Sequence, residues 1–270
     1  MSTFTATKIQ GATGRAHIAG PRRWDGWWVY PACVIAGLGA FIVYSTWAAL
    51  QNAHYYATPY LSPFYSPCLS TDCQHVTLPL LGRLPQLPLL GALSPAFLIL
   101  WVPAGFRLTC YYYRKAYYRS FWGAPPACAV PDARTGYTGE TRFPLVVQNF
   151  HRYAFYLATL LIVVLTWDAL LAFRFPDGFG IGVGTVILWA NVVLLAGYTF
   201  SCHSCRHLCG GGLDVFSRAP TRYRVWRLVT RINERHPTFA WLSLGSVGLT
   251  DLYIRLVSMG VIRDVRLIFF

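Results

Sequence analysis

Five long apolar segments constrain the fold of this chain more than any other feature of its sequence. Each is about 20 residues or longer, enough for an α-helix to cross a hydrocarbon core about 30 Å thick. Only 12% of the residues are charged, whereas a soluble domain carries about a quarter. We therefore predict an all-α integral membrane protein, a bundle of five transmembrane helices. The predicted spans are residues 27–50, 87–111, 151–173, 179–201 and 237–262.

The predicted membrane domain covers residues 27–262, between an N-terminal tail, residues 1–26, and a C-terminal tail, residues 263–270. The first apolar segment is too long for a signal peptide and has no small-residue cleavage site after it, so we interpret it as an uncleaved span. Pro95 and Pro103 are expected to kink the second span.

Basic residues give the predicted orientation. The chain carries a net charge of +13, but its Lys and Arg residues gather in three blocks: four in the N-terminal tail, seven in residues 107–152 and seven in residues 206–235. Blocks that alternate with apolar segments are typical of membrane topology, not of nucleic-acid binding. The bias predicts a multi-pass protein of the plasma (inner) membrane, with its N-terminus in the cytoplasm and its C-terminus outside.

Two further pairs fit this topology. Cys68 and Cys73 lie in the predicted exterior loop between the first two spans, where a disulfide can form and persist. Asp251 and Arg255 lie one turn apart in the fifth span, which predicts an internal ion pair. Proton movement is the alternative for Asp251, because charge inside a membrane often serves function.

Residues 201–207, Ser-Cys-His-Ser-Cys-Arg-His, place two thiols and two imidazoles within six residues. Sulfur and imidazole donors packed this closely indicate a metal or iron–sulfur centre. On the predicted topology, several histidines gather at the cytoplasmic ends of spans three to five. These are His151, His203, His207 and His236.

A continuous fourth helix would place Cys202 and Cys205 on one face, about 60° apart at 100° per residue. Their thiolates would then meet imidazoles from neighbouring helices, and His151 and His236 open spans three and five at the same depth. Two cysteines and two histidines describe a Rieske-type [2Fe–2S] cluster, with zinc as the chemical rival. If the helix instead unwinds here, His207 becomes a ligand through its Cys-x-His spacing from Cys205.

Haem is the other alternative. A two-haem electron wire needs four axial ligands at two depths, but no histidine lies at the outer ends of the spans. A single haem b held by His151 and His236 remains open. A membrane transporter or structural protein with zinc at the inner face is a third reading, from another functional class.

The chain resembles the membrane-anchor subunit of actinobacterial succinate dehydrogenase, the single-subunit, five-helix kind found in mycobacteria. The resemblance implies a subunit of respiratory complex II whose flavoprotein partner oxidises succinate and whose iron–sulfur partner delivers electrons to the membrane. It further implies menaquinone as the acceptor and a Rieske-type cluster in place of haem. The segments that carry it are residues 63–68, 106–119, 137–144, 151–153 and 201–207.

Trp27, Arg107 and Tyr111 are candidates to contact the quinone, since they are polar or aromatic groups at the expected depth. No catalytic residue is expected on this chain, because the flavin site lies on a partner. Membrane lipids are expected partners as well, and the resemblance leaves open a higher oligomer of the complex.

Overall fold

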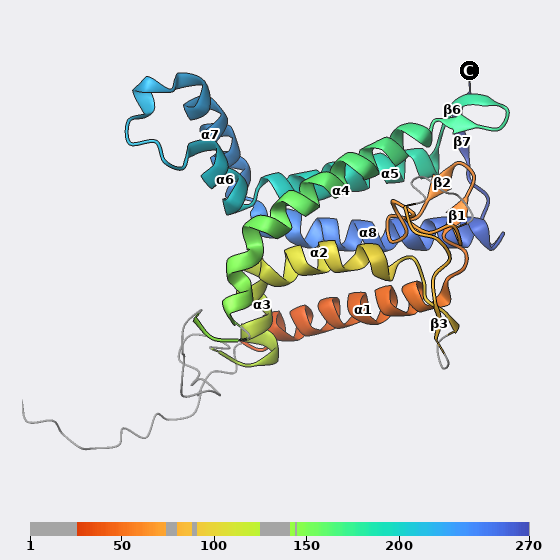
Figure 1. Ribbon diagram of the computed structural model, residues 1–270, viewed down its shortest axis with the longest axis horizontal. Helices are drawn as coiled ribbons and strands as arrows, with labels where there is room; N and C mark the ends of the chain where they lie inside the picture. Colours follow the sequence, from red (N-terminus) through yellow and green to blue (C-terminus); the bar gives the residue numbers. More distant parts are fainter. Residues whose placement is uncertain (1–25, 74–79, 88–90, 125–140, 144, 270) are drawn as a thin grey trace, which may run out of the picture.

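The computed structural model describes residues 26–73, 80–87, 91–124, 141–143 and 145–269. The predicted N-terminal tail, Gly26 apart, lies outside these ranges. Five helices run side by side along the long axis of the molecule (Figure 1). They are α1 Val29–Gln51, α2 Phe97–Thr109, α4 His151–Leu171, α5 Val183–Phe200 and α8 His236–Ser258.

Three helical segments in the described part of the chain are long and apolar enough to cross a membrane: Val29–Gln51, Leu145–Leu171 and Val183–Phe200. The second of these joins the 3₁₀ helix η2, Leu145–Phe150, to α4. α8 has 23 residues but is less apolar than these three. α2 has only 13 residues, about 20 Å of helix, which is shorter than a hydrocarbon core of about 30 Å.

The predicted second span, residues 87–111, is therefore only partly helical. Strands β3, Gln86–Leu87, and β4, Gly91–Ala92, pair as a hairpin ahead of α2. Pro95 lies in the turn before the helix and does not kink it, whereas Pro103 lies inside α2. Apolar composition does not specify where a helix starts, and Pro95, which cannot donate a backbone hydrogen bond, lies just before this one.

The fourth predicted span also begins later than expected. Its first residues form β6, Gly178–Gly182, which pairs with β5, Arg174–Phe175, on one side and β7, Arg266–Phe269, on the other. The predicted C-terminal tail thus joins a three-stranded sheet at one end of the bundle (Figure 1).

The two ends of the bundle differ. At one end, here called the site end, α1, α4 and α8 begin and α2 and α5 finish (Figure 1). Short helices gather there, and α7 projects away from the bundle. These helices are α3 Tyr111–Phe121, α6 His203–Gly210, η3 Phe216–Arg218 and α7 Pro220–Asn233. The opposite end, the hairpin end, carries the strands, including β1 Tyr56–Ala57 and β2 Tyr60–Leu61.

Buried carboxylates anchor the loop at the hairpin end. Ser62 donates a hydrogen bond to Asp251, and Ser66 donates one to Asp168. The predicted ion pair is confirmed: Arg255 Nε lies 2.6 Å from Asp251 Oδ2, and both side chains are fully buried. Tyr44 also donates to Asp251, at 2.6 Å, so both oxygens of this carboxylate are occupied.

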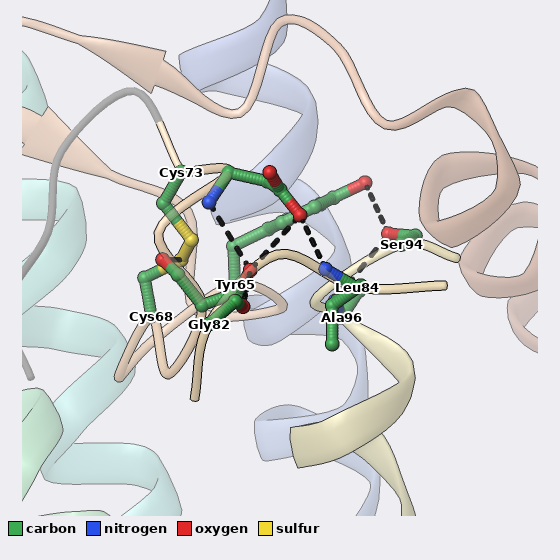
Figure 2. The surroundings of a disulfide bond; sticks show 9 residues. Tyr65, Cys68, Cys73, Gly82, Leu84, Ser94 and Ala96 are labelled. Carbon is green, nitrogen blue, oxygen red and sulfur yellow. Dashed lines mark hydrogen bonds between the residues drawn. A yellow bond between two sulfur atoms is a disulfide. The ribbon is translucent and has the colours of Figure 1, made fainter. Parts of the chain in front are cut away.

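A disulfide between Cys68 and Cys73 closes a turn of the same loop (Figure 2). Next to it, the Asp72 carboxylate accepts a hydrogen bond from the Leu84 backbone N–H at 2.7 Å. Ser94, just before α2, donates to the Tyr65 hydroxyl at 3.3 Å. The disulfide turn therefore holds the segment that leads into α2.

Candidate metal centre

Four side chains with metal-binding atoms converge at the site end from four helix boundaries. Cys110 lies in extended backbone between α2 and α3, with ψ of 128°, and Cys202 lies in extended backbone between α5 and α6, with ψ of 147°. His151 and His236 are the first residues of α4 and α8. All four are at most 7% exposed.

The first Cys–His pair joins α4 to the break after α5. His151 Nε2 lies 2.9 Å from Cys202 Sγ, and His151 Nδ1 lies 2.9 Å from Thr109 Oγ1. The Thr109 hydroxyl donates its own proton to the Gly105 carbonyl at 2.7 Å. Nδ1 of His151 therefore faces this hydroxyl, and Nε2 faces the thiol.

The second pair repeats this arrangement from the other two helices. His236 Nε2 lies 3.3 Å from Cys110 Sγ, and His236 Nδ1 lies 2.7 Å from Ser201 Oγ. Ser201 donates to the Tyr198 carbonyl at 3.0 Å. Here too Nδ1 faces the hydroxyl, and Nε2 faces the thiol.

An aromatic ring stacks on each of the two imidazoles. Phe106 stacks on His151 with ring centroids 4.9 Å apart, and Tyr198 stacks on His236 at 5.0 Å. These two rings belong to the same buried cluster as Cys110 and Cys202. The donors thus sit in a largely apolar pocket, where charge on a bound ion is poorly screened.

Burial also acts on the thiols that follow α5. It raises the pKa of Cys202 to about 12. The pKa of Cys205 rises to about 11, first through burial and then through the neighbouring Cys209 thiol. Such thiols keep their protons at neutral pH unless a metal cation replaces them.

The structure brings together three residues of the predicted ligand set: Cys202, His151 and His236. It adds Cys110, which was not among the predicted ligands. The helix breaks at Cys202, which excludes the continuous helix, one of the two alternatives considered for this segment. One sequence signal could have found Cys110: Thr109-Cys110 and Ser201-Cys202 are both hydroxyl–cysteine dipeptides at the end of an apolar segment.

The remaining predicted residues lie around this core. Cys205 is on α6 at 9% exposure. His203 stacks on His151 at 5.2 Å, and one ligand atom each from His151, Cys202 and His203 lie within 4.8 Å of one another. His207 is exposed on α6, which stays helical through it, and its Nδ1 lies 3.2 Å from Arg152.

Two spaces adjoin the donors. A cleft of about 390 Å³ opens at the site end beside His151, and Tyr111, His203 and His207 line its wall. An apolar cavity of about 140 Å³ lies between the helices behind Phe106 and Tyr198.

The predicted quinone residues are not brought together. Tyr111 lines the cleft and Arg107 lines the cavity. Arg107 is already engaged, since it donates to the Tyr113 hydroxyl, the Ala240 carbonyl and the Ser243 hydroxyl at 2.6–3.1 Å. Trp27 precedes α1 and lines neither the cleft nor the cavity.

The donor set fits a thiolate-bound metal centre. Two cysteine sulfurs and two imidazole nitrogens, each imidazole oriented through its other nitrogen, are the ligands of a Rieske-type [2Fe–2S] cluster and also of tetrahedral zinc.

Residues 29–260 match the family model described as actinobacterial succinate dehydrogenase subunit SdhC. The chain belongs to this family. It is a subunit of succinate dehydrogenase, anchored in the membrane, and the catalytic part of the enzyme lies on other chains.

A solved structure supports the assignment. The chain is similar to a chain of the Mycobacterium smegmatis Sdh1 complex in the apo form, with 49% identity and a TM-score of 0.86, over 96% of this chain and 97% of that one. A comparison with curated proteins found no match. The resemblance noted from the sequence is thus confirmed at the level of the family, and this SdhC chain works within a succinate dehydrogenase complex.

Proposed function

We propose that this SdhC chain passes electrons from the iron–sulfur subunit of succinate dehydrogenase to a quinone through a Rieske-type [2Fe–2S] cluster at its site end. A flavoprotein partner would oxidise succinate, and menaquinone would be the membrane acceptor. When bound, such a cluster supplies one-electron redox chemistry. The proposal rests on two buried Cys–His pairs, Cys202 with His151 and Cys110 with His236, here called the crossed pairs. Their four members come from four different helix boundaries.

In this proposal Cys110, Cys202, His151 and His236 hold the cluster. Two further residues predicted from the sequence are the alternatives: Cys205 as the second thiolate and His207 as an imidazole ligand. Two observations favour the first set: both Nε2 atoms lie within 3.3 Å of the Cys110 or Cys202 sulfur, and His207 is exposed to solvent.

The alternatives differ in how well the geometry suits them. Haem held by His151 and His236 would leave the two buried thiols beside their Nε2 atoms without a role. Zinc suits the same donors as the cluster. Metal content is therefore the property that separates the two thiolate-bound centres.

We place the quinone headgroup in the cleft beside His151. Its volume of about 390 Å³ lies in the usual range for small-molecule sites, about 300–1,000 Å³, whereas the 140 Å³ cavity lies below it. Reduction of a quinone to a quinol takes up two electrons and two protons. Tyr111, His203 and His207 line the cleft and can donate hydrogen bonds to quinone oxygens or relay protons from water.

The quinone site can be tested separately. Tyr111→Phe is expected to raise the KM for quinone severalfold and leave succinate oxidation by a soluble acceptor unchanged. Tyr117→Phe is the control, because that hydroxyl donates to the Leu108 carbonyl and does not line the cleft. An unchanged KM in Tyr111→Phe would move the quinone elsewhere.

We further propose that the five-helix bundle lies across the plasma membrane, with the site end on the cytoplasmic side. The three basic blocks of the sequence support this orientation. A protease-cleavable tag at the N-terminus should be cut only in vesicles that expose the cytoplasmic face. Cleavage from the outside would reverse the orientation.

The cluster assignment is tested by iron and acid-labile sulfide analysis of purified complexes. Cys110→Ala is expected to lose about two irons and two sulfides per complex relative to wild type, as expected for a [2Fe–2S] centre. Cys209→Ala is the matched control: it removes a partly exposed thiol of α6 outside the crossed pairs. Full iron and sulfide in Cys110→Ala, with a loss in Cys205→Ala, would give the second thiolate role to Cys205.

A further inference from the structure

We infer that Thr109 and Ser201 are positioning residues that fix which nitrogen of each histidine faces the metal centre. This inference rests on the proposed function, since it concerns the ligands of the same site. Both residues are buried, Thr109 at 5% and Ser201 at 0% exposure.

The number of protons on each hydroxyl decides the direction of its hydrogen bonds. A hydroxyl has one proton to donate, and both hydroxyls use it on a backbone carbonyl of their own helix segment: Thr109 on Gly105 and Ser201 on Tyr198. The contacts of 2.9 Å to His151 Nδ1 and 2.7 Å to His236 Nδ1 must then be donated by the histidines. Each imidazole is held as the Nδ1–H tautomer, with a lone pair on Nε2.

The two hydroxyls act across the site in a reciprocal way. Thr109 precedes Cys110 but holds His151, which faces Cys202. Ser201 precedes Cys202 but holds His236, which faces Cys110. Each hydroxyl–cysteine dipeptide thus supplies one thiol and orients the histidine that pairs with the other thiol.

Loss of either hydroxyl would leave a buried Nδ1–H without an acceptor. The imidazole would then rotate or change tautomer, and Nε2–H could not ligate. Removal of such an orienting partner typically weakens metal binding about 10–100-fold. Thr109→Val and Ser201→Ala should therefore lower cluster retention against a chelator by that factor.

Matched variants separate positioning from packing. Thr159→Val removes a hydroxyl that makes the same kind of bond, to the Phe155 carbonyl four residues back, but holds no histidine. Ser45→Ala removes one that donates to the Ile42 carbonyl. Both should keep the cluster, and the conservative Thr109→Ser should restore what Thr109→Val loses.

Pulsed EPR of the wild-type complex with histidine labelled with ¹⁵N at Nδ1 tests the tautomers without any variant. The inference predicts strong coupling from two unlabelled Nε2 nitrogens and weak coupling from the labelled Nδ1 nitrogens. Strong coupling from labelled nitrogen, or full cluster retention in both Thr109→Val and Ser201→Ala, would overturn it. A complex without a Rieske-type [2Fe–2S] cluster would instead refute the proposed function, so the two failures are distinguishable.

Discussion

At the scale of single residues, the Tyr198 hydroxyl has no oxygen or nitrogen partner within the described ranges and interacts with the Cys110 thiol, although the side chain is 1% exposed. Its ring stacks on His236 and packs in the same buried cluster as Cys110. A buried hydroxyl without an oxygen or nitrogen partner calls for an explanation. A sulfur of the proposed cluster is the acceptor that the surroundings suggest.

Tyr198→Phe should therefore lower the reduction potential of the cluster, because a hydrogen bond to sulfur stabilises the reduced, more negative state. A loss of about 1 kcal/mol corresponds to about 40 mV for one electron. Tyr113→Phe is the control, since that hydroxyl donates to the Ala240 carbonyl at 2.6 Å. Equal potentials in Tyr198→Phe and wild type, measured by redox titration with EPR, would exclude this bond.

The sequence indicated which residue types could bind a metal, but it did not indicate which of these residues contact one another. Cys202, His151 and His236 could be selected because the two thiols of residues 202–205 lie close together in the sequence and both histidines open predicted spans at the same depth. Cys110 was not selected because the sequence between α2 and α3 contains no Pro or Gly that would indicate a helix break there. The orienting roles of Thr109 and Ser201 depend on distances between helices that no local pattern encodes.

At the scale of elements, the buried Asp251–Arg255 pair ties α8 to the hairpin end. Arg255 also donates to the Ala48 and Ala53 carbonyls at the end of α1, at 2.7–2.8 Å. The helix α8, the end of α1 and the loop that carries Ser62 are thus joined through one ion pair. Spacing alone predicted the pair, because residues four apart face the same side of a helix.

Asp251→Asn should destabilise the complex strongly, because it leaves the buried Arg255 charge without a counter-charge. Breaking a buried pair in this way costs about 3–5 kcal/mol. Asp177→Asn is the control: its pair with Arg266 is exposed, at 63% and 42% of the two side chains, and such pairs contribute about 0–1 kcal/mol. Thermal unfolding of the two purified variants compares them, and similar losses of Tm would contradict the buried role.

The elements differ from expectation where apolar composition does not specify conformation. Residues 87–96 are as apolar as a span, but the paired strands β3 and β4 and Pro95 precede the start of α2. The interruption at Cys202 likewise follows an uninterrupted apolar run. Lipid-facing composition predicts burial in the membrane, whereas helix ends depend on local hydrogen bonds and tertiary contacts.

At the scale of the whole molecule, the centre lies at one end of the bundle, on the side that the basic blocks assign to the cytoplasm. Cys202→Ala or His236→Ala should abolish succinate-driven quinone reduction, because the chain then lacks a ligand of its only proposed redox centre. Succinate oxidation by an artificial soluble acceptor should persist, since the flavin site is on another subunit. If both rates survived in the purified complex, the ligand assignment would be wrong.

The family and the membrane role could be recognised from the sequence because they rest on long matching segments. Assembly with partner chains was implied in the same way. The ligand set could not be fixed, since four helix boundaries distant in sequence supply it.

An EPR spectrum of the purified complex reduced with dithionite, recorded beside its absorption spectrum and metal content, tests the central claim most directly. The account predicts a Rieske-like [2Fe–2S] signal that is absent from Cys110→Ala and present in Cys209→Ala. A b-type haem band without such a signal, or zinc without the corresponding iron, would contradict it.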